Sequence, residues 1–307
     1  MTSTPVPPSG RQCAIEAGPY AAVVVEVGAG LRTLHHRERA LVDGYDLHEP
    51  VDAARGQMLV PWPNRIRDGR YSFGGRDHQL DLSEPAQHNA IHGLCRWVGW
   101  QVAAHRTDQV VLTHRLHAQP GYPFTLDLEV AYTVHAEDGL AVRMTATNVG
   151  ADPAPYAAGA HPYLTTGQGL DQCTVHLRAE TWLPTDAQGL PIGRRPVAGT
   201  AYDLRAPQSL AGLALDHAFT GLAREEDGRA WAALTGEDGS TTSLWVDSSF
   251  GYIQLYSGDG LPPSRRRTGL AAEPMTAPPN AFITGDDLRV LAPGESFTGG
   301  WGIVATR

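Results

Sequence analysis

Strict alternation of apolar and polar residues is the clearest pattern in this chain. Residues 126–134 place Leu, Leu, Val, Tyr and Val at every second position, with Asp, Glu, Ala and Thr between them. A period of two is typical of a β-strand with one buried face. The alternation resumes at 140–147, after a break that contains Asp138-Gly139, a dipeptide suited to a tight turn. The sequence therefore predicts a hairpin of two antiparallel strands.

The same arrangement recurs along the chain. Residues 230–235 and 241–246 flank a Gly-Glu-Asp-Gly turn, and a looser pair occupies 98–104 and 110–116. Other short runs are rich in β-branched or aromatic residues, which favour strands, and they lie at 21–27, 252–256 and 297–304.

Helical patterns are almost missing. Only residues 209–215 suggest one or two helical turns, while 34 Gly and 23 Pro punctuate the short strands. Many short strands without a βαβ alternation predict antiparallel sheets packed as a sandwich or barrel. We expect one all-β domain over residues 1–307, with 1–19 as a poorly ordered or peripheral N-terminal segment.

Composition narrows the function. With 42% hydrophobic and 19% charged residues the chain should fold by itself. All 24 basic residues are Arg, so no lysine exists to form a Schiff base with a carbonyl substrate. A net charge of -9 with scattered bases argues against a nucleic-acid partner.

The expected location and the interpretation of the cysteines depend on the apolar segments and the cysteine spacing of the sequence. The start has no signal-like apolar region, and no apolar run approaches the roughly 18 to 20 residues of a membrane span. We expect a cytoplasmic protein without a membrane partner. Cys13, Cys95 and Cys173 are widely spaced and odd in number, so we interpret them as packing residues.

Polar side chains concentrate in five short segments at strand ends or in Gly/Pro loops: residues 61–66, 89–93, 160–163, 216–219 and 272–275. Loops on a rigid scaffold often carry function. Together these segments offer carboxylates, imidazoles and a guanidinium, an acid–base set for a polyhydroxylated ligand.

His161 and Glu273 are the strongest candidates for proton transfer. Each is followed by Pro, so each is expected in an irregular segment. An imidazole exchanges protons near neutral pH. The alternatives are that His161 caps a turn and that Glu273 is an ordinary surface carboxylate.

Other polar and aromatic residues keep two interpretations. Arg65 could clamp a ligand or form a structural ion pair. Three tryptophans could stack on sugar rings or fill the core, namely Trp62, Trp97 and Trp100. His88 and His92 would suit a metal only on a helix, and the Gly93 that follows favours a loop, so we expect no metal site.

Five motifs in sequence order resemble the aldose 1-epimerase (galactose mutarotase) family: Asn64-Arg65-Ile66, His92-Gly93, His161-Pro162-Tyr163, Asp216-His217-Ala218-Phe219 and Glu273-Pro274. The resemblance runs from about residue 21 to 304. It implies a large antiparallel β-sandwich, the galactose mutarotase-like supersandwich, and an isomerase of carbohydrate metabolism that interconverts the α and β anomers of a hexose.

The resemblance also implies roles for individual residues. Glu273 would be the general base on the anomeric hydroxyl, and His161 the general acid at the ring oxygen. The groups that hold the sugar would be Asn64, Arg65, His92 and Asp216. No metal and no organic cofactor is implied.

Departures from the family pattern leave the substrate open. Leu94-Cys95-Arg96-Trp97 replaces a double-glycine form, and Tyr256-Ser257-Gly258 replaces Tyr-Thr-Gly. The chain looks more like a bacterial branch that includes a sulfosugar mutarotase. The substrate is therefore expected to be glucose, galactose or a related hexose, anionic or neutral, and the protein a monomer or homodimer.

Two other functions fit the same residues. Glu273 and Asp216 could act as the paired carboxylates of a glycosidase. A protein without catalytic activity could instead bind carbohydrate on a platform of Trp62, Trp97 and Trp100.

Overall fold

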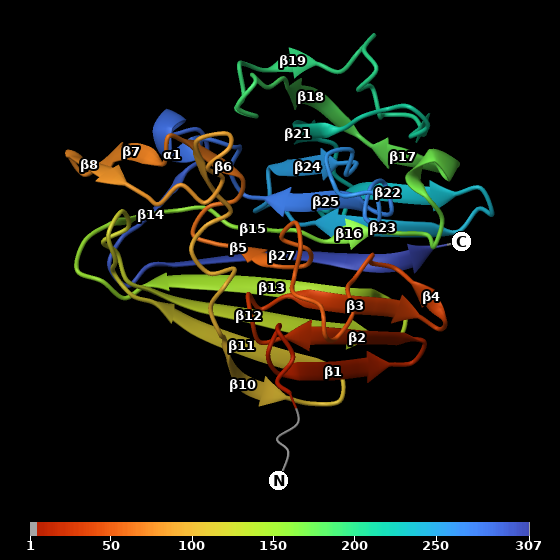
Figure 1. Ribbon diagram of the computed structural model, residues 1–307, viewed down its shortest axis with the longest axis horizontal. Helices are drawn as coiled ribbons and strands as arrows, with labels where there is room; N and C mark the ends of the chain where they lie inside the picture. The colour runs from red at the N-terminus through yellow and green to blue at the C-terminus, as the bar shows by residue number, and fades with distance from the viewer. Residues whose placement is uncertain (1–4, 307) are drawn as a thin grey trace.

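The computed structural model describes residues 5–306, and its regular secondary structure is almost entirely antiparallel strand (Figure 1). Its helices are α1 (Ala281–Thr284) and a 3₁₀ turn at Leu170–Gln172, and none in the described range is long and apolar enough to cross a membrane. The helical turns predicted at 209–215 are wrong. Strand β20 (Gln208–Ser209) occupies the first of these positions, and a turn with Gly212 at φ 72° follows it.

The largest sheet has nine strands in the order β10-β11-β12-β13-β27-β23-β22-β17-β20. Besides β20 its strands are β10 (Gln101–His105), β11 (Gln109–Leu116), β12 (Leu126–His135), β13 (Gly139–Asn148), β17 (Cys173–Leu177), β22 (Ala230–Gly236), β23 (Thr241–Val246) and β27 (Ser296–Thr306). The predicted hairpins are confirmed, and the first closes with His135 opposite Gly139.

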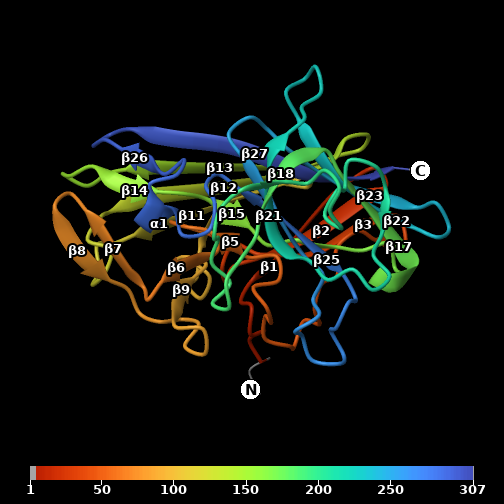
Figure 2. The same ribbon diagram turned by 90° about the horizontal axis from the view of Figure 1, so that it is seen from above.

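One face of this sheet is covered and the other is open. Along β12 the apolar residues Leu126, Leu128, Val130, Tyr132 and Val134 are buried, while the residues between them are not. Figures 1 and 2 show the two other large sheets on the same side of it. Burying both inner faces between sheets is the usual reason for a sandwich.

Those covering sheets have eight strands and four strands. The eight-stranded sheet contains β5 (Met58–Leu59), β15 (Gly159–Ala160), β16 (Tyr163–Leu164), β18 (Ala179–Leu183), β19 (Arg195–Pro196), β21 (Asp216–Leu222), β24 (Tyr252–Tyr256) and β25 (Leu270–Met275). The four-stranded sheet contains β1 (Gln12–Ala17), β2 (Tyr20–Val25), β3 (Leu31–His36) and β4 (Arg39–Ala40).

Three two-stranded ribbons complete the fold. They pair β6 (Arg65–Arg67) with β9 (Asn89–Ile91), β7 (Arg70–Phe73) with β8 (Arg76–Gln79), and β14 (Ala154–Tyr156) with β26 (Arg289–Leu291). One apolar cluster runs from Cys13 in β1 to Ile303 in β27.

The N-terminal segment is more integrated than expected. Strand β1 pairs along its length with β2, and Cys13 and Ile15 are buried in the core. The prediction that 1–19 is poorly ordered or peripheral is therefore wrong for residues 12–17, because their apolar side chains have a sheet to pack on. Residues 1–4 lie outside the described range. All three cysteines are unpaired and buried, as their interpretation as packing residues requires.

Candidate active site

A cleft of about 320 Å³ contains all six residues singled out as catalytic or sugar-binding: Asn64, Arg65, His92, His161, Asp216 and Glu273. They come from different parts of the fold. Pairing of β6 with β9 places Arg65 opposite Ile91, the residue that precedes His92 in the sequence. Strands β15 and β16, on either side of His161, both pair with β25, which carries Glu273. Asp216 begins β21, one strand further along the sheet than β24.

Glu273 lies in a regular strand, which corrects the expected irregular segment. It is opposite Gln254 of β24, and its neighbour Pro274 is opposite Ile253. Glu273 is only 2% exposed. The carboxyl group is therefore held rigidly by a central strand, and sheet pairing overrode the local signal from proline.

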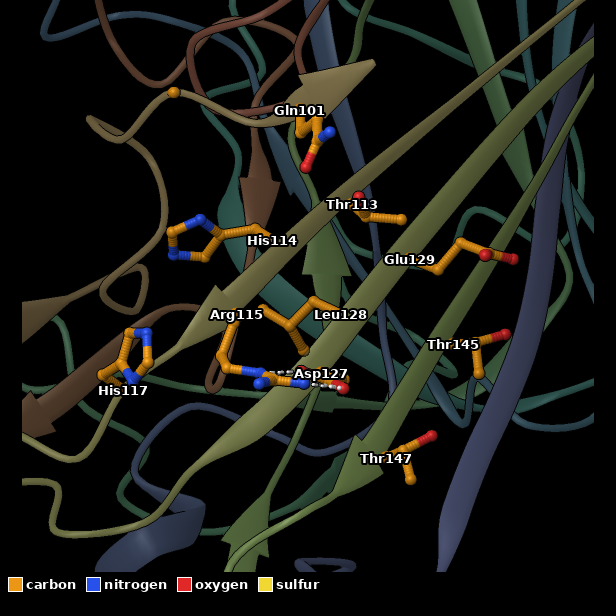
Figure 3. A pocket seen from close by; sticks show the side chains of 11 residues that line it. Gln101, Thr113, His114, Arg115, His117, Asp127, Leu128, Glu129, Thr145 and Thr147 are labelled. Carbon is orange, nitrogen blue, oxygen red and sulfur yellow. Dashed lines mark hydrogen bonds and ion pairs between the residues drawn. The ribbon is translucent and has the colours of Figure 1, made fainter. Parts of the chain in front are cut away.

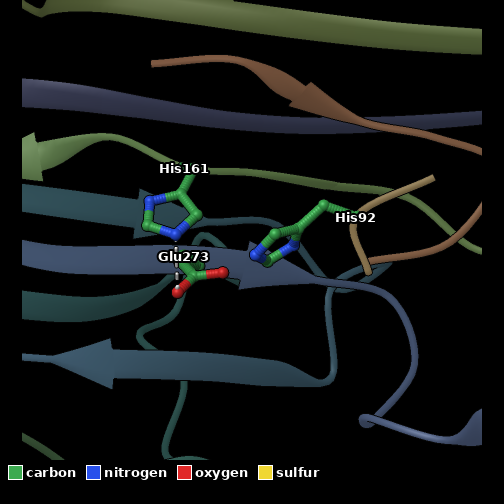
Figure 4. Close-up of side chains that lie close together, drawn as sticks. All are labelled: His92, His161 and Glu273. Carbon is green, nitrogen blue, oxygen red and sulfur yellow. Dashed lines mark ion pairs between the residues drawn. The ribbon is translucent and has the colours of Figure 1, made fainter. Parts of the chain in front are cut away.

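His161 occupies an irregular segment, as predicted, and faces Glu273. Its Nε2 lies 3.4 Å from Oε1 of Glu273, and it is 5% exposed (Figure 4). Burial lowers the pKa of His161 to about 3, with the charges of Arg55 and Arg96 contributing to the fall and a hydrogen bond to its own backbone opposing it. Burial also raises the pKa of Glu273 well above its ordinary value, with Asp216 adding to the rise and Arg65 opposing it. The free protein therefore favours a neutral imidazole beside a protonated carboxyl group.

His92 is fixed by a reciprocal pair of hydrogen bonds with Asn64. The Asn64 N–H donates to Nδ1 of His92 over 3.1 Å, and the His92 N–H donates to the Asn64 carbonyl over 2.9 Å. Both residues have positive φ, 54° and 63°, a conformation that Asn and His tolerate better than most residues. Since Nδ1 accepts this hydrogen bond, a neutral His92 carries its ring proton on Nε2.

The same hydrogen bond bears on metal binding. His92, His161 and Glu273 are buried, and one ligand-type atom of each lies within 4.8 Å of the others. A metal-bound histidine, however, normally donates its second ring N–H to an acceptor. His92 has the reverse arrangement, so this cluster fits proton transfer and hydrogen bonding better than metal coordination.

Arg65 forms a structural ion pair and also lines the cleft. Its Nε and a terminal nitrogen donate to the two carboxylate oxygens of Glu84 over 2.8 and 2.9 Å, and its other terminal nitrogen lies 3.9 Å from Asp216. Gln254 donates to Asp216 over 2.7 Å. The guanidinium is thus a structural ion pair and also part of the cleft wall.

Arg96 is a cleft residue that the sequence motifs do not indicate. Its Nε is buried and has no hydrogen-bond partner within residues 5–306. Burial lowers the pKa of Arg96 to about 10, opposed by Glu84, so the group is charged at neutral pH. Its position four residues after His92, in the same loop, was the available signal.

The tryptophans and His88 behave differently from the cleft residues. Trp62 and Trp100 are buried in the core, whereas Trp97 is 60% exposed and lines the cleft. A three-tryptophan sugar platform is therefore wrong. His88 is exposed and contacts Asp68 at 2.7 Å, away from the buried cluster.

Known proteins match this chain over most of its length. The model of a family described as aldose 1-epimerase matches residues 11–302. The uncharacterized protein YihR of Escherichia coli K12 is 35% identical over 288 residues, which cover 94% of this chain and 91% of that protein. A galactose mutarotase from Mus musculus is 26% identical over 285 residues, covering 84% of this chain and 80% of that protein.

Solved structures match the fold. A GalM/aldose epimerase homologue from C. elegans has a TM-score of 0.87 at 21% identity and covers 97% of this chain and 99% of its own. A galactose 1-epimerase from Lactobacillus acidophilus has a TM-score of 0.80 at 21% identity and covers 96% of this chain and 95% of its own. These structures confirm the expected large antiparallel β-sandwich.

Proposed function

The chain belongs to the aldose 1-epimerase family and is an isomerase, and we propose that it interconverts the α and β anomers of a hexose by acid–base opening and closure of the sugar ring. The observation that carries this proposal is the buried His161–Glu273 contact of 3.4 Å inside a polar cleft. Two proton-transfer groups at this separation match a reaction that moves one proton off the sugar and another onto it.

The proposed reaction conserves all atoms of the sugar. Glu273 takes the proton from the anomeric hydroxyl while His161 gives a proton to the ring oxygen. The bond between C1 and the ring oxygen breaks, and C1 becomes an aldehyde. Rotation about the C1–C2 bond presents the other face, and the reverse transfers close the ring. Each positioned acid or base contributes about 10²- to 10⁴-fold.

The pair enters the reaction with one transferable proton. Burial raises the pKa of Glu273 and lowers that of His161, so it favours the state with this proton on Glu273 and a neutral His161. One transfer across the contact gives the reactive ion pair, a carboxylate and an imidazolium, without any proton from solvent. Arg65 favours the carboxylate because its positive charge lowers the pKa of Glu273.

The remaining cleft residues hold the sugar hydroxyls in this proposal. His92 supplies an Nε2–H donor, Asp216 an acceptor and Arg65 a donor. Asn64 acts in part through its backbone, which sets the proton position on His92. Such contacts position the anomeric carbon between the acid and the base.

Anomer exchange measured by polarimetry or NMR tests the proposal. The assay compares glucose, galactose and an anionic hexose, the last because Arg96 offers the cleft a charge with an unpartnered Nε. We expect at least one hexose to exchange faster than in buffer. Saturable binding without faster exchange would favour a non-catalytic protein, and sugar release from aryl glycosides would favour a glycosidase. The sulfosugar branch stays a prediction.

A further inference from the structure

The imidazole of His161 is oriented in an unusual way. Catalytic imidazoles are commonly held by a hydrogen bond at the second ring nitrogen. Here Nδ1 of His161 is buried and makes no hydrogen bond to any other residue of the described chain. The contact from Nε2 to Glu273, at 3.4 Å, is longer than a charge-assisted hydrogen bond of about 2.7–2.9 Å. Hydrogen bonds to other residues therefore hold the ring weakly, and the remaining one is to the backbone of His161 itself.

Aromatic packing takes the place of that hydrogen bond. The ring of Tyr163 is stacked on His161, with centroids 5.0 Å apart and an angle of 22° between the planes. The ring of His92 meets the same imidazole edge-on, with the ring centroids 5.2 Å apart and an angle of 79° between the planes. A parallel stacked ring restricts rotation of the imidazole plane, whereas an edge contact restricts it less.

Tyr163 is itself held by a buried cation. Cζ of Arg55 lies 4.0 Å from the centre of the Tyr163 ring. Arg55 is 1% exposed and is paired with Asp43 at 2.8 Å and Asp52 at 3.1 Å. The cation is thus fixed by two carboxylates and the aromatic ring is fixed by the cation.

The same short segment also holds the backbone of His161. The Gly56 N–H donates to the His161 carbonyl over 2.8 Å, and the His161 N–H donates to the Gln57 carbonyl over 3.1 Å. Gly56 has φ 74°, and a Cβ there would lie 2.0 Å from the Leu31 carbonyl oxygen. Residues 55–57 therefore fix both the main chain of His161 and the ring stacked on it.

We propose that Tyr163, backed by Arg55, is the positioning residue that aims Nε2 of His161 at the reacting sugar, in place of a hydrogen bond to Nδ1. The inference rests on the proposed role of His161 as the proton donor. It assigns to Tyr163 a function that depends on a flat ring and not on its hydroxyl group, which donates to the Ala53 carbonyl over a long 3.4 Å.

Two substitutions at one position separate the ring from the hydroxyl. Tyr163→Phe keeps the stacked ring and so keeps His161 in position. We therefore expect kcat for anomer exchange within about threefold of wild type. Tyr163→Leu removes the flat ring, and we expect kcat to fall roughly 10- to 100-fold with KM nearly unchanged. Tyr163→Met, which fills the space with a flexible chain, should match Leu and serves if Leu does not fold.

Tyr132→Leu is the matched control for lost stability. Tyr132 is also buried and also donates to a backbone carbonyl, that of Ala29 at 2.6 Å, but it is not part of the cleft wall. The Tyr132→Leu variant should have a lower Tm and a kcat within about twofold of wild type, because the substitution affects stability outside the cleft.

The outcomes separate this inference from the proposed function. Wild-type kcat in a folded Tyr163→Leu or Tyr163→Met protein would overturn the positioning role, and so would a Tyr163→Phe protein as slow as Leu. A wild-type protein that does not accelerate anomer exchange with any hexose would instead overturn the proposed function.

Discussion

Two of the polar hollows in this protein differ in size, burial and charge pairing. The larger, about 780 Å³, lies on the open face of the nine-stranded sheet and is lined by strands β10 to β13 (Figure 3). There Arg115 and Asp127 share two hydrogen bonds of 2.6 and 2.7 Å and are 56% and 42% exposed. The smaller cleft, about 320 Å³, holds His161 and Glu273, each with a buried polar atom unpartnered in the described chain.

The difference shows that volume does not identify the site. On the open face, alternation of the strands places polar residues in water, where they pair with one another. The Arg115 hydrogen bonds hold the pKa of Asp127 below its ordinary value, which keeps the carboxylate charged and satisfied. In the cleft, burial pushes the pKa of His161 down and that of Glu273 up. Buried ionisable groups without full hydrogen bonding are costly and mark functional sites.

The largest expected effect comes from Glu273→Gln. This change removes the proposed base and should lower kcat for anomer exchange by about 10³-fold, within the range of a lost acid–base group. Polarimetry or NMR exchange measures the rate. An exchange rate equal to wild type would remove Glu273 from the mechanism.

The same substitution should stabilise the fold near neutral pH. Because the folded pKa of Glu273 is raised, wild-type stability is lost as pH rises from the unfolded pKa through the folded one. Gln has no such dependence. We expect calorimetry to show a higher Tm for Glu273→Gln than for wild type, with a larger difference at pH 7.5 than at pH 4.5. A variant with a lower Tm than wild type at both pH values would contradict this.

A smaller effect is expected at His92. His92→Phe keeps an aromatic ring but removes the Nε2–H donor, so kcat/KM should fall about tenfold, the equivalent of one lost hydrogen bond. His92→Gln retains a donor and should recover part of the loss. Equal activity of the Phe variant and wild type would show that this donor does not contact the sugar.

The pH dependence should be weak on the acid side. The pKa of His161 is lowered to about 3, so the ring gains a second proton only far below neutrality. We expect kcat/KM to fall less than about twofold between pH 7 and pH 5. If His161 had an ordinary pKa of 6.5, the pair would take up a second proton, Glu273 could not act as the base, and the rate would fall roughly 25-fold. A clear acid limb near pH 6.5 would contradict the buried, neutral imidazole.

The smallest effect is expected in the larger hollow. Replacing both Arg115 and Asp127 by Ala removes a solvent-exposed ion pair, and such pairs contribute little to the free energy of unfolding. Anomer exchange should be unchanged, and Tm nearly so. A marked loss of kcat in this double variant would mean that the open face takes part in catalysis.

Much of the fold could be predicted because it depends on local patterns. The alternation at 126–134 and 140–147 gave both the strands and the turn between them. Residues 209–215 could not be assigned correctly because their conformation depends on a strand that is distant in the chain. Residues 12–17 were assigned wrongly although they pair in a tight hairpin with the strand that follows them. Strand β1 forms on β2, and β20 is a short edge strand beside β17.

The site was predictable in its members and less so in its chemistry. The five motifs indicated which residues gather in the cleft. They did not indicate that Glu273 lies in a central strand, that Arg96 joins the cleft, or that burial raises the pKa of Glu273 and lowers that of His161. Those properties arise from packing around the residues, which no short motif records.

A double-mutant cycle on His161 and Glu273 tests most directly whether they act as one acid–base pair. The assay is anomer exchange with the best hexose at pH 7, using His161→Gln, Glu273→Gln and the double variant. We predict that each single change removes nearly all acceleration over buffer and that the double variant is no slower than the singles, as for residues that act as a unit. Losses that multiply in the double variant would contradict the account.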